Sequence, residues 1–167
     1  MRIQIFKFGY VSGNKASFYS VKLNNDNISL IEHFLNDNIA LFKSELRNIV
    51  NRLKIMGETE GAREHYFRPE EGIPGDRVCA LYDSPEKNLR LYCIRFGTKL
   101  VLLGSGGYKP KKISALQQDP KLKLENKRII DIVKLIEKRM EEGEIWISSD
   151  GMDFEGNLDL KDNYYED

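Results

Sequence analysis

Three strand-like runs joined by very short connections constrain the fold of this chain more than any other feature. The runs are RVCALY (Arg77–Tyr82), LRLYCIRF (Leu89–Phe96) and KLVLL (Lys99–Leu103), and the connections are DSPEKN and GT. Such connections are too short for a crossover to a parallel neighbour, so the runs predict a three-stranded antiparallel meander. In the middle run, a period of two places Arg90 on the same face as Tyr92.

The residues before the meander predict a β-hairpin followed by two helices. Ile3–Phe8 and Ser17–Leu23 alternate and are rich in aromatic residues, and the intervening VSGNK supplies turn chemistry. Ser29, with Glu32 three residues later, forms a capping-box pattern that opens a short helix. A second helix, ending at Gly57, is predicted by an apolar stripe of helical spacing, made of Phe42, Leu46, Ile49, Val50 and Leu53.

Two further segments complete the predicted α+β fold. The Gly-, Pro- and charge-rich residues 58–76 predict a loop with a short extended piece at HYF. After the meander, a long helix is predicted by a stripe made of Ile129, Val133, Ile136 and Met140, and Glu144–Ser148 predicts one more strand. We expect residues 1–142 to form a single domain and residues 143–167 to be an acidic C-terminal extension.

In the stretch LVLLGSGGYKPKKISA, residues 100–115, an apolar run is followed by clustered cations. We expect the strand to break at Gly104 into a hinge of small residues. Tyr108, Lys109, Lys111 and Lys112 then follow within five positions and would lie at the rim of the sheet. A solvated turn is the alternative interpretation.

The formal net charge of zero conceals an uneven distribution of charge. Residues 1–140 hold 25 Lys and Arg against 16 Asp and Glu, whereas residues 141–167 hold one Lys against ten acids. This asymmetry favours a polyanionic partner for the basic part of the chain, with ordinary surface charge as the alternative. No apolar run approaches the roughly 18 residues of a membrane span, and no secretory signal is evident, so we expect a cytoplasmic protein without membrane contact.

The two cysteines give no indication of metal or disulfide chemistry. Cys79 and Cys93 both lie in strand-like runs, without CxxC spacing and without a nearby histidine cluster. They are predicted to be small core residues. We expect neither a metal nor another cofactor.

The order of these elements, together with VCALYDSPEKNLRLYCIRFGTKLVLLGSGGYKPKK at residues 78–112, resembles the RelE/HigB family of bacterial toxins in the RelE/ParE superfamily. Members have a strand, a pair of helices and a three-stranded antiparallel meander, whose last strand leads into a basic segment and a variable terminal helix. The resemblance covers residues 17–112. It implies a RelE-like fold in which the meander packs against the two helices, with an added N-terminal hairpin and a C-terminal helix.

The resemblance implies a toxin component of a type II toxin–antitoxin system, acting as a ribosome-dependent endoribonuclease on messenger RNA. In the family, a ribose 2′-hydroxyl attacks the adjacent phosphate. That chemistry needs a base, a donor for the leaving oxygen and cations for the transition state, and it needs no metal. The implied partners are the ribosome, messenger RNA and a cognate antitoxin protein with a helix-turn-helix.

The resemblance also assigns site residues. Arg90 stands where the family often has an arginine, and its guanidinium would hold the phosphate bidentately. Tyr108 and Lys112 complete the expected catalytic set, and His65 is a candidate acid or base. RNA contacts are expected from four further cations, Lys109, Lys111, Arg95 and Arg77.

Several alternatives stay open at this point. Arg90 could instead pair with Glu86 or Asp83 on the sheet face, and Tyr108 could pack against the terminal helix. Only Arg77 is basic on the strand before Arg90, where RelE has further basic residues, so the general base is unassigned. The chain could therefore be a non-catalytic relative that binds RNA or protein, or a ParE-like inhibitor of a topoisomerase. A further hypothesis places the acidic extension over the cations at residues 109–112, as an intramolecular phosphate mimic.

Overall fold

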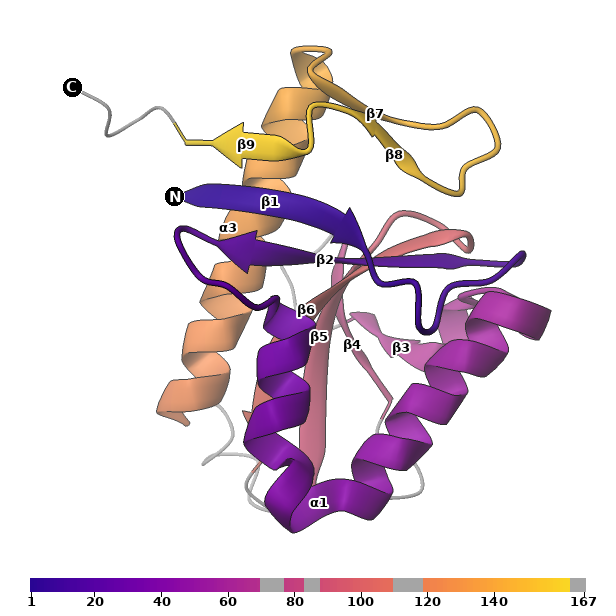
Figure 1. Cartoon of the computed structure of the whole chain (residues 1–167), viewed down its shortest axis with the longest axis vertical. Helices are drawn as coiled ribbons and strands as arrows, with labels where there is room; N and C mark the ends of the chain where they lie inside the picture. The colour runs from indigo at the N-terminus through magenta and orange to yellow at the C-terminus, as the bar shows by residue number, and fades with distance from the viewer. Residues whose placement is uncertain (70–76, 83–87, 110–118, 163–167) are drawn as a thin grey trace.

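In the computed structural model, the chain forms a seven-stranded mixed sheet with helices on both faces (Figure 1). The structure describes residues 1–69, 77–82, 88–109 and 119–162. The strands of the main sheet are β1 (Arg2–Lys7), β2 (Ser17–Leu23), β3 (Phe67–Arg68), β4 (Val78–Leu81), β5 (Leu89–Arg95), β6 (Leu100–Tyr108) and β9 (Asp159–Lys161). A second sheet contains β7 (Ile145–Ile147) and β8 (Phe154–Gly156), and the long helices are α1 (Leu30–Ile55) and α3 (Pro120–Glu141). The predicted α+β class is confirmed.

The strand order is β3-β4-β5-β6-β2-β1-β9. Strands β4, β5 and β6 pair antiparallel, which confirms the predicted meander, and β1 pairs antiparallel with β2, which confirms the predicted hairpin. Strand β2 lies parallel to β6, with Ser17 opposite Leu100 and Tyr19 opposite Leu102. The hairpin is therefore part of the same sheet as the meander.

Helix α1 consists of two arms that meet at a sharp bend. Ser29 caps the first arm, its hydroxyl oxygen accepting a hydrogen bond from the Glu32 backbone N–H at 3.3 Å, as the capping pattern predicts. Phe42 lies at the bend with φ −132° and ψ 38°, which are not helical angles. The second arm ends at Ile55, two residues before the predicted end, and continues as a π-helical turn, Met56–Glu60.

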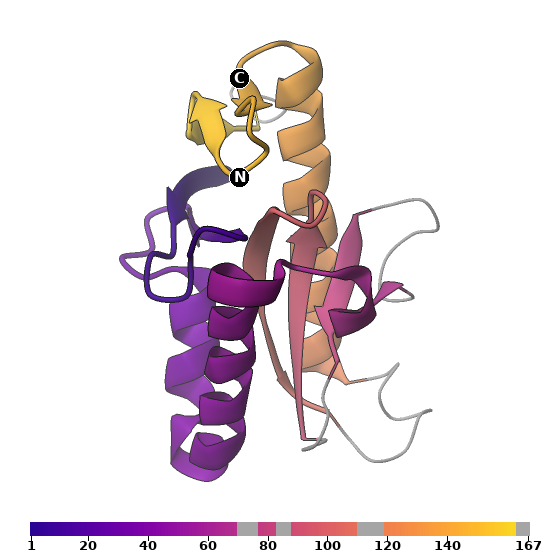
Figure 2. The same ribbon diagram turned by 90° about the vertical axis from the view of Figure 1, so that its right-hand side faces the viewer.

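The sheet separates two apolar cores. Leu89, Leu91 and Cys93 of β5 belong to the core shared with α1, whereas Tyr92 and Ile94 belong to the core shared with α3. This is the alternation that a period of two predicts. Figure 2 shows both arms of α1 on one side of the sheet. Both cysteines are free and buried, in agreement with the prediction.

The predicted hinge at Gly104 is wrong, because β6 continues as a strand to Tyr108. The register between β5 and β6 shifts between Leu91 and Cys93, so that Gly104 and Ser105 both lie opposite Tyr92 in a β-bulge. A β-carbon on Gly104 would lie 2.8 Å from Ile129 Cδ1, and one on Gly106 would lie 1.8 Å from the Arg90 carbonyl oxygen. These glycines permit close packing inside the sheet and do not end it.

The described part of the acidic extension belongs to the fold. Strand β9 pairs antiparallel with β1, and Ile145, Phe154 and Leu160 are buried in the α3-side core. The Arg2 guanidinium contacts the Asp159 carboxylate at 2.6 Å. By donating this hydrogen bond, Arg2 holds the pKa of Asp159 below its usual value.

Asp153 of the extension also pairs at the β1–β2 side of the sheet. Its Oδ1 accepts a hydrogen bond from the Tyr19 hydroxyl at 2.8 Å and lies 3.1 Å from Lys7 Nζ. These two carboxylates, Asp153 and Asp159, therefore pair with the hairpin, whereas the phosphate-mimic hypothesis places the extension over residues 109–112, of which 110–112 lie outside the described residues.

Candidate functional site

The predicted site residues lie at opposite ends of β5. Arg90, Tyr108 and Lys109 lie where β5 begins and β6 ends, whereas Arg95 and Arg77 lie where β5 ends and β4 begins. At about 3.4 Å per residue, five residues of strand separate Arg90 from Arg95 by about 17 Å. Lys111 and Lys112 lie outside the described residues. The prediction of one combined site therefore divides into two regions.

Arg90 and Tyr108 are on opposite faces of the sheet. Arg90 is opposite Gly107, shares the α3-side face with Tyr92, and is only 4% exposed. Tyr108 is opposite Leu89 and stacks on Phe42 of α1, with ring centroids 5.7 Å apart and an interplanar angle of 12°. The expected joint action of Arg90 and Tyr108 on one phosphate does not fit this geometry. Tyr108 packs on α1, and not on the terminal helix as the alternative suggested.

A buried carboxylate fixes the beginning of β5. Glu45 of α1 is 4% exposed, and its Oε1 accepts hydrogen bonds from the backbone N–H groups of Asn88 at 3.0 Å and Leu89 at 3.1 Å. The Lys109 backbone N–H donates to the Asn88 carbonyl at 2.8 Å. Glu45 is not among the predicted site residues, although a charged residue three positions after Phe42 in an apolar helical stripe is the signal that could have identified it.

Three arginines at the β3–β4–β5 edge each lie over an aromatic ring, and we call this group the arginine edge. The distances from the guanidinium carbon to the ring centroid are 4.7 Å for Arg77 over Phe96, 5.7 Å for Arg95 over Phe67 and 6.0 Å for Arg68 over Tyr82. Stacking on a ring holds a guanidinium plane in a fixed orientation.

Further contacts anchor two of these arginines. Arg95 Nε donates to the Ala62 carbonyl at 2.9 Å, and Arg77 Nε lies 3.3 Å from Glu137 Oε1. Arg77 and Arg95 line one cavity of about 270 Å³, together with Phe67 and Glu64. Two of the predicted RNA-binding residues are thus brought together.

His65 lies next to this cavity and does not line it. It belongs to a short 3₁₀ turn, Glu64–Tyr66, and its exposed ring lies 4.2 Å from the ring of Tyr66. The predicted extended piece at HYF is limited to the two residues of β3. At this edge the described residues supply cations and aromatic surface, which suit phosphate and base contacts better than proton transfer.

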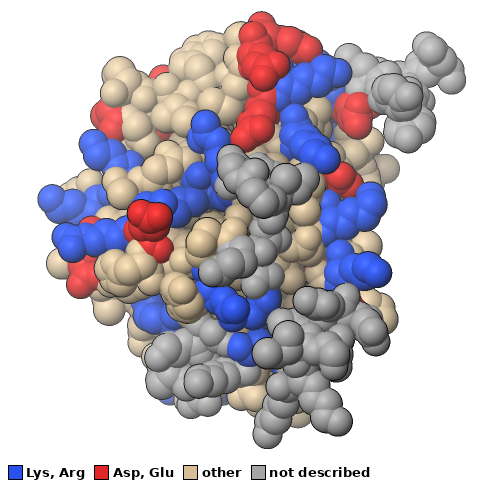
Figure 3. Space-filling view, turned by 180° about the vertical axis from the view of Figure 1, so that it is seen from behind, with Lys and Arg blue, Asp and Glu red and all other residues tan. Residues whose placement is uncertain are grey.

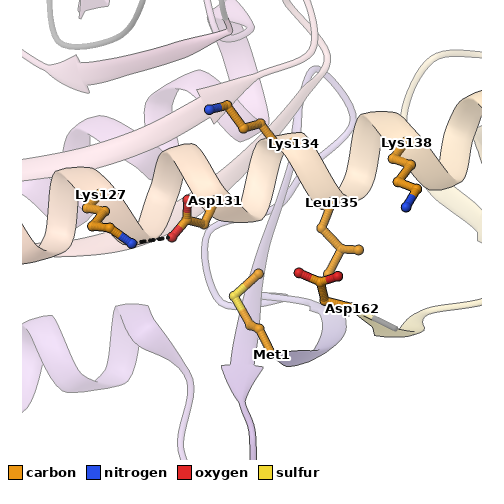
Figure 4. A pocket seen from close by; sticks show the side chains of 7 residues that line it. All are labelled: Met1, Lys127, Asp131, Lys134, Leu135, Lys138 and Asp162. Atoms are coloured by element: carbon orange, nitrogen blue, oxygen red, sulfur yellow. Dashed lines mark hydrogen bonds and ion pairs between the residues drawn. The ribbon is translucent and has the colours of Figure 1, made fainter. Parts of the chain in front are cut away.

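Figure 3 shows the face turned away from α1, where lysine and arginine side chains predominate over acids. A groove of about 510 Å³ also carries cations, between α3 and the β1 and β9 ends. Its lysines are Lys127, Lys134 and Lys138, but Lys127 pairs with Asp131 at 3.0 Å and Asp162 lies at the same groove (Figure 4). The groove and the arginine edge each pair one cation with a carboxylate, and the arginine edge differs in that its cations lie over aromatic rings.

Comparison of the chain with protein-family models, with curated proteins and with solved structures gave no match. Within residues 1–69, 77–82, 88–109 and 119–162, no group of three or more His, Cys, Asp or Glu side chains is placed to hold a metal ion. In the same part of the chain, each helix is too short or too polar to cross a membrane.

Proposed function

We propose that this chain is a RelE/HigB-like toxin component that acts on RNA at the ribosome in the cytoplasm and is neutralised by a cognate antitoxin protein. The observation that carries this proposal is the order of the described elements. Strand β2, the two arms of α1, the meander β4–β5–β6 and helix α3 follow one another as in the family that the sequence resembles. The parallel pairing of β2 with β6 supports it further, because it places β2 and the meander in one sheet.

The arginine edge is the proposed RNA contact. The guanidinium groups there can donate a fork of N–H groups to a phosphate, with Arg77 exchanging its contact with Glu137 to do so, and the adjacent rings offer stacking surface for unpaired bases. Arg77 and Arg95 flank one cavity, so a single phosphate could contact both. Binding of this kind loses affinity as salt rises, because counterions are released from the RNA.

A second candidate function is RNA binding without cleavage. It is favoured by the placement of Arg90 and Tyr108 on opposite faces, with Arg90 only 4% exposed. A buried guanidinium beneath α3 fits a role in holding the sheet better than one in stabilising a phosphorane. In this case the protein would block a ribosomal site by occupying it.

Induced expression of the chain in a bacterial host, followed by mapping of new RNA ends on translating ribosomes, tests the proposal. Growth arrest with new ends inside coding sequences is expected for an endoribonuclease, whereas arrest without new ends would support binding alone. Unimpaired growth at high expression would refute the toxin function.

The contact surface is tested with a matched pair of double variants. Arg77→Ala with Arg95→Ala should weaken ribosome or RNA binding and relieve the arrest. Lys134→Ala with Lys138→Ala removes the same charge from the α3 groove and should leave both unchanged. Equal effects of the two double variants would show that net charge matters and that the arginine edge does not.

A further inference from the structure

A second cavity of about 270 Å³ lies between α1, the first turns of α3 and the free side of β6. Strand β2 stops pairing with β6 after Tyr19 and Leu102, and the Ser20 hydroxyl then donates to the Leu103 carbonyl at 2.8 Å. The bulge that follows places Ser105 in the wall of this cavity, which we call the polar cleft. Bulges often redirect a side chain in this way.

Two buried oxygens of the polar cleft have no hydrogen-bond partner in the part of the chain that the structure describes. Glu125 is 2% exposed, and both Lys121 Nζ at 3.1 Å and Arg128 Nη1 at 2.9 Å contact its Oε1. The other carboxylate oxygen, Oε2, and the hydroxyl of Ser105, which is 3% exposed, have no partner among the described residues. Burying such atoms unsatisfied is costly, so their retention points to a group that satisfies them on binding.

The rim of the polar cleft carries both signs of charge. Lys121 Nζ lies 4.0 Å from Asp37 Oδ2, so the lysine spans from α3 to α1, and its side chain is 46% exposed. On the other side, His33 Nε2 and Asp26 Oδ2 are 2.6 Å apart, and this hydrogen bond lowers the pKa of Asp26. Because three carboxylates line the cleft beside only two permanent cations, the cleft suits a neutral polar group that offers hydrogen-bond donors better than a bare phosphate.

We propose that the polar cleft binds a guanine base. Guanine is the base whose pairing edge has two adjacent donors, N1–H and the 2-amino group, which suit the carboxylate of Glu125. Its O6 and N7 are acceptors for the hydroxyl of Ser105 and the amine of Lys121. This inference rests on the proposed function, in which the base belongs to an RNA strand.

The size of the cleft agrees with this ligand. Pockets for drug-sized ligands start at about 300 Å³, and the polar cleft, at about 270 Å³, suits a single ring system and not a whole nucleotide. The base enters as the half-exposed Lys121 exchanges its contact with Asp37 for one with the base. The ribose and phosphate then remain outside.

Calorimetric titration of the purified chain with GMP, IMP and AMP tests the proposal. IMP lacks the 2-amino group, so it should bind about tenfold more weakly than GMP, and AMP more weakly still. Glu125→Gln should reduce GMP affinity by about tenfold or more, whereas Glu141→Gln, at the end of the same helix, should not change it. Equal affinities for GMP and AMP, or no GMP binding at millimolar concentration, would overturn the proposal.

A pair of serine variants separates binding from folding. Ser105→Ala and Ser17→Ala each remove a buried hydroxyl without a partner, and Ser17 lies in β2, outside the residues that line the polar cleft. Neither change should lower the melting temperature, but only Ser105→Ala should weaken GMP binding. If both variants bind GMP as the parent does, Ser105 does not touch the base and the proposed site is wrong.

The two proposals fail in distinguishable ways. GMP binding with the expected preference, but without growth arrest or ribosome binding, would refute the toxin function and leave the guanine site standing. Growth arrest and RNA binding without a preference for GMP would refute the guanine site alone.

Discussion

Replacing Gly106 by alanine is expected to destabilise the protein severely. The new β-carbon would lie 1.8 Å from the Arg90 carbonyl oxygen, 2.8 Å from the Arg90 carbonyl carbon and 3.2 Å from Leu91 Cα. All three obstructing atoms are backbone, so no side-chain rotation relieves the clash. Since non-bonded carbon atoms rest about 3.5–4.0 Å apart, β5 and β6 would have to separate by more than about 1 Å.

The expected cost combines two effects. Overpacking in a core costs about 1–3 kcal/mol, and each ladder hydrogen bond lost beside Arg90 and Gly107 adds about 1 kcal/mol. We therefore expect the free energy of unfolding to fall by about 3 kcal/mol or more. Where space allows, the same change stabilises a protein by about 0.4–1 kcal/mol through the unfolded state.

Urea unfolding followed by circular dichroism measures this difference. Gly9→Ala is the matched control, because a β-carbon there would meet nothing within 4 Å. We expect it to change the free energy of unfolding by less than about 1 kcal/mol. If Gly106→Ala unfolds at the same urea concentration as the parent, Gly106 is not packed against β5. In that case β6 ends at Gly104, as the sequence-based prediction of a hinge there requires.

Four further predictions follow from burial and charge. Arg90→Ala should lower the melting temperature, because the side chain is only 4% exposed, and a thermal scan checks this before any growth assay is interpreted. Leu160→Ala should reduce the free energy of unfolding by about 2–5 kcal/mol in urea, since β9 is anchored by this side chain. Burial raises the pKa of the Cys79 thiol to about 12, so native protein should resist iodoacetamide at pH 8 and react once unfolded. The contribution of this protonated thiol to the free energy of unfolding is fully present below pH about 8.5, the pKa of an unfolded cysteine, and is lost as the pH rises toward 12. Thermal scans at alkaline pH would detect this loss. Finally, the Arg77 and Arg95 double variant should reduce the slope of log affinity against log salt by about 2 in RNA-binding titrations.

Much of the fold could be predicted because its signals are local. The short connections define the antiparallel meander, the alternation in β5 assigns its residues to the two faces, and Ser29 marks the beginning of α1. Each of these depends on residues within a few positions of one another. Their agreement with the structure follows from the fixed periods of strands and helices.

The misplaced hinge has a different cause. In the sequence, Gly104 and Gly106 are typical of a turn. In the structure they are glycines because a β-carbon would clash with Ile129 or with the Arg90 backbone, which lie far away along the chain. Tertiary contact of this kind leaves no local pattern.

The candidate site was less accessible to prediction for the same reason. The three arginines of the arginine edge come from separate segments of the chain. The polar cleft likewise combines Ser105 of β6 with Glu125 of α3. The sequence could indicate only that cations are candidate contact residues. It could not indicate that Arg90 and Tyr108 face opposite sides, because the bulge that governs the later part of β6 depends on packing against α3.

The pairing of β1 with β9 links the first strand of the chain to the last. During synthesis, the outer edge of β1 has no strand to cover it until Asp159–Lys161 have left the ribosome. At about 5–20 residues per second, the chain between the two strands takes on the order of 10–30 s to be made. For that interval the uncovered edge of β1 can pair with a strand of another chain.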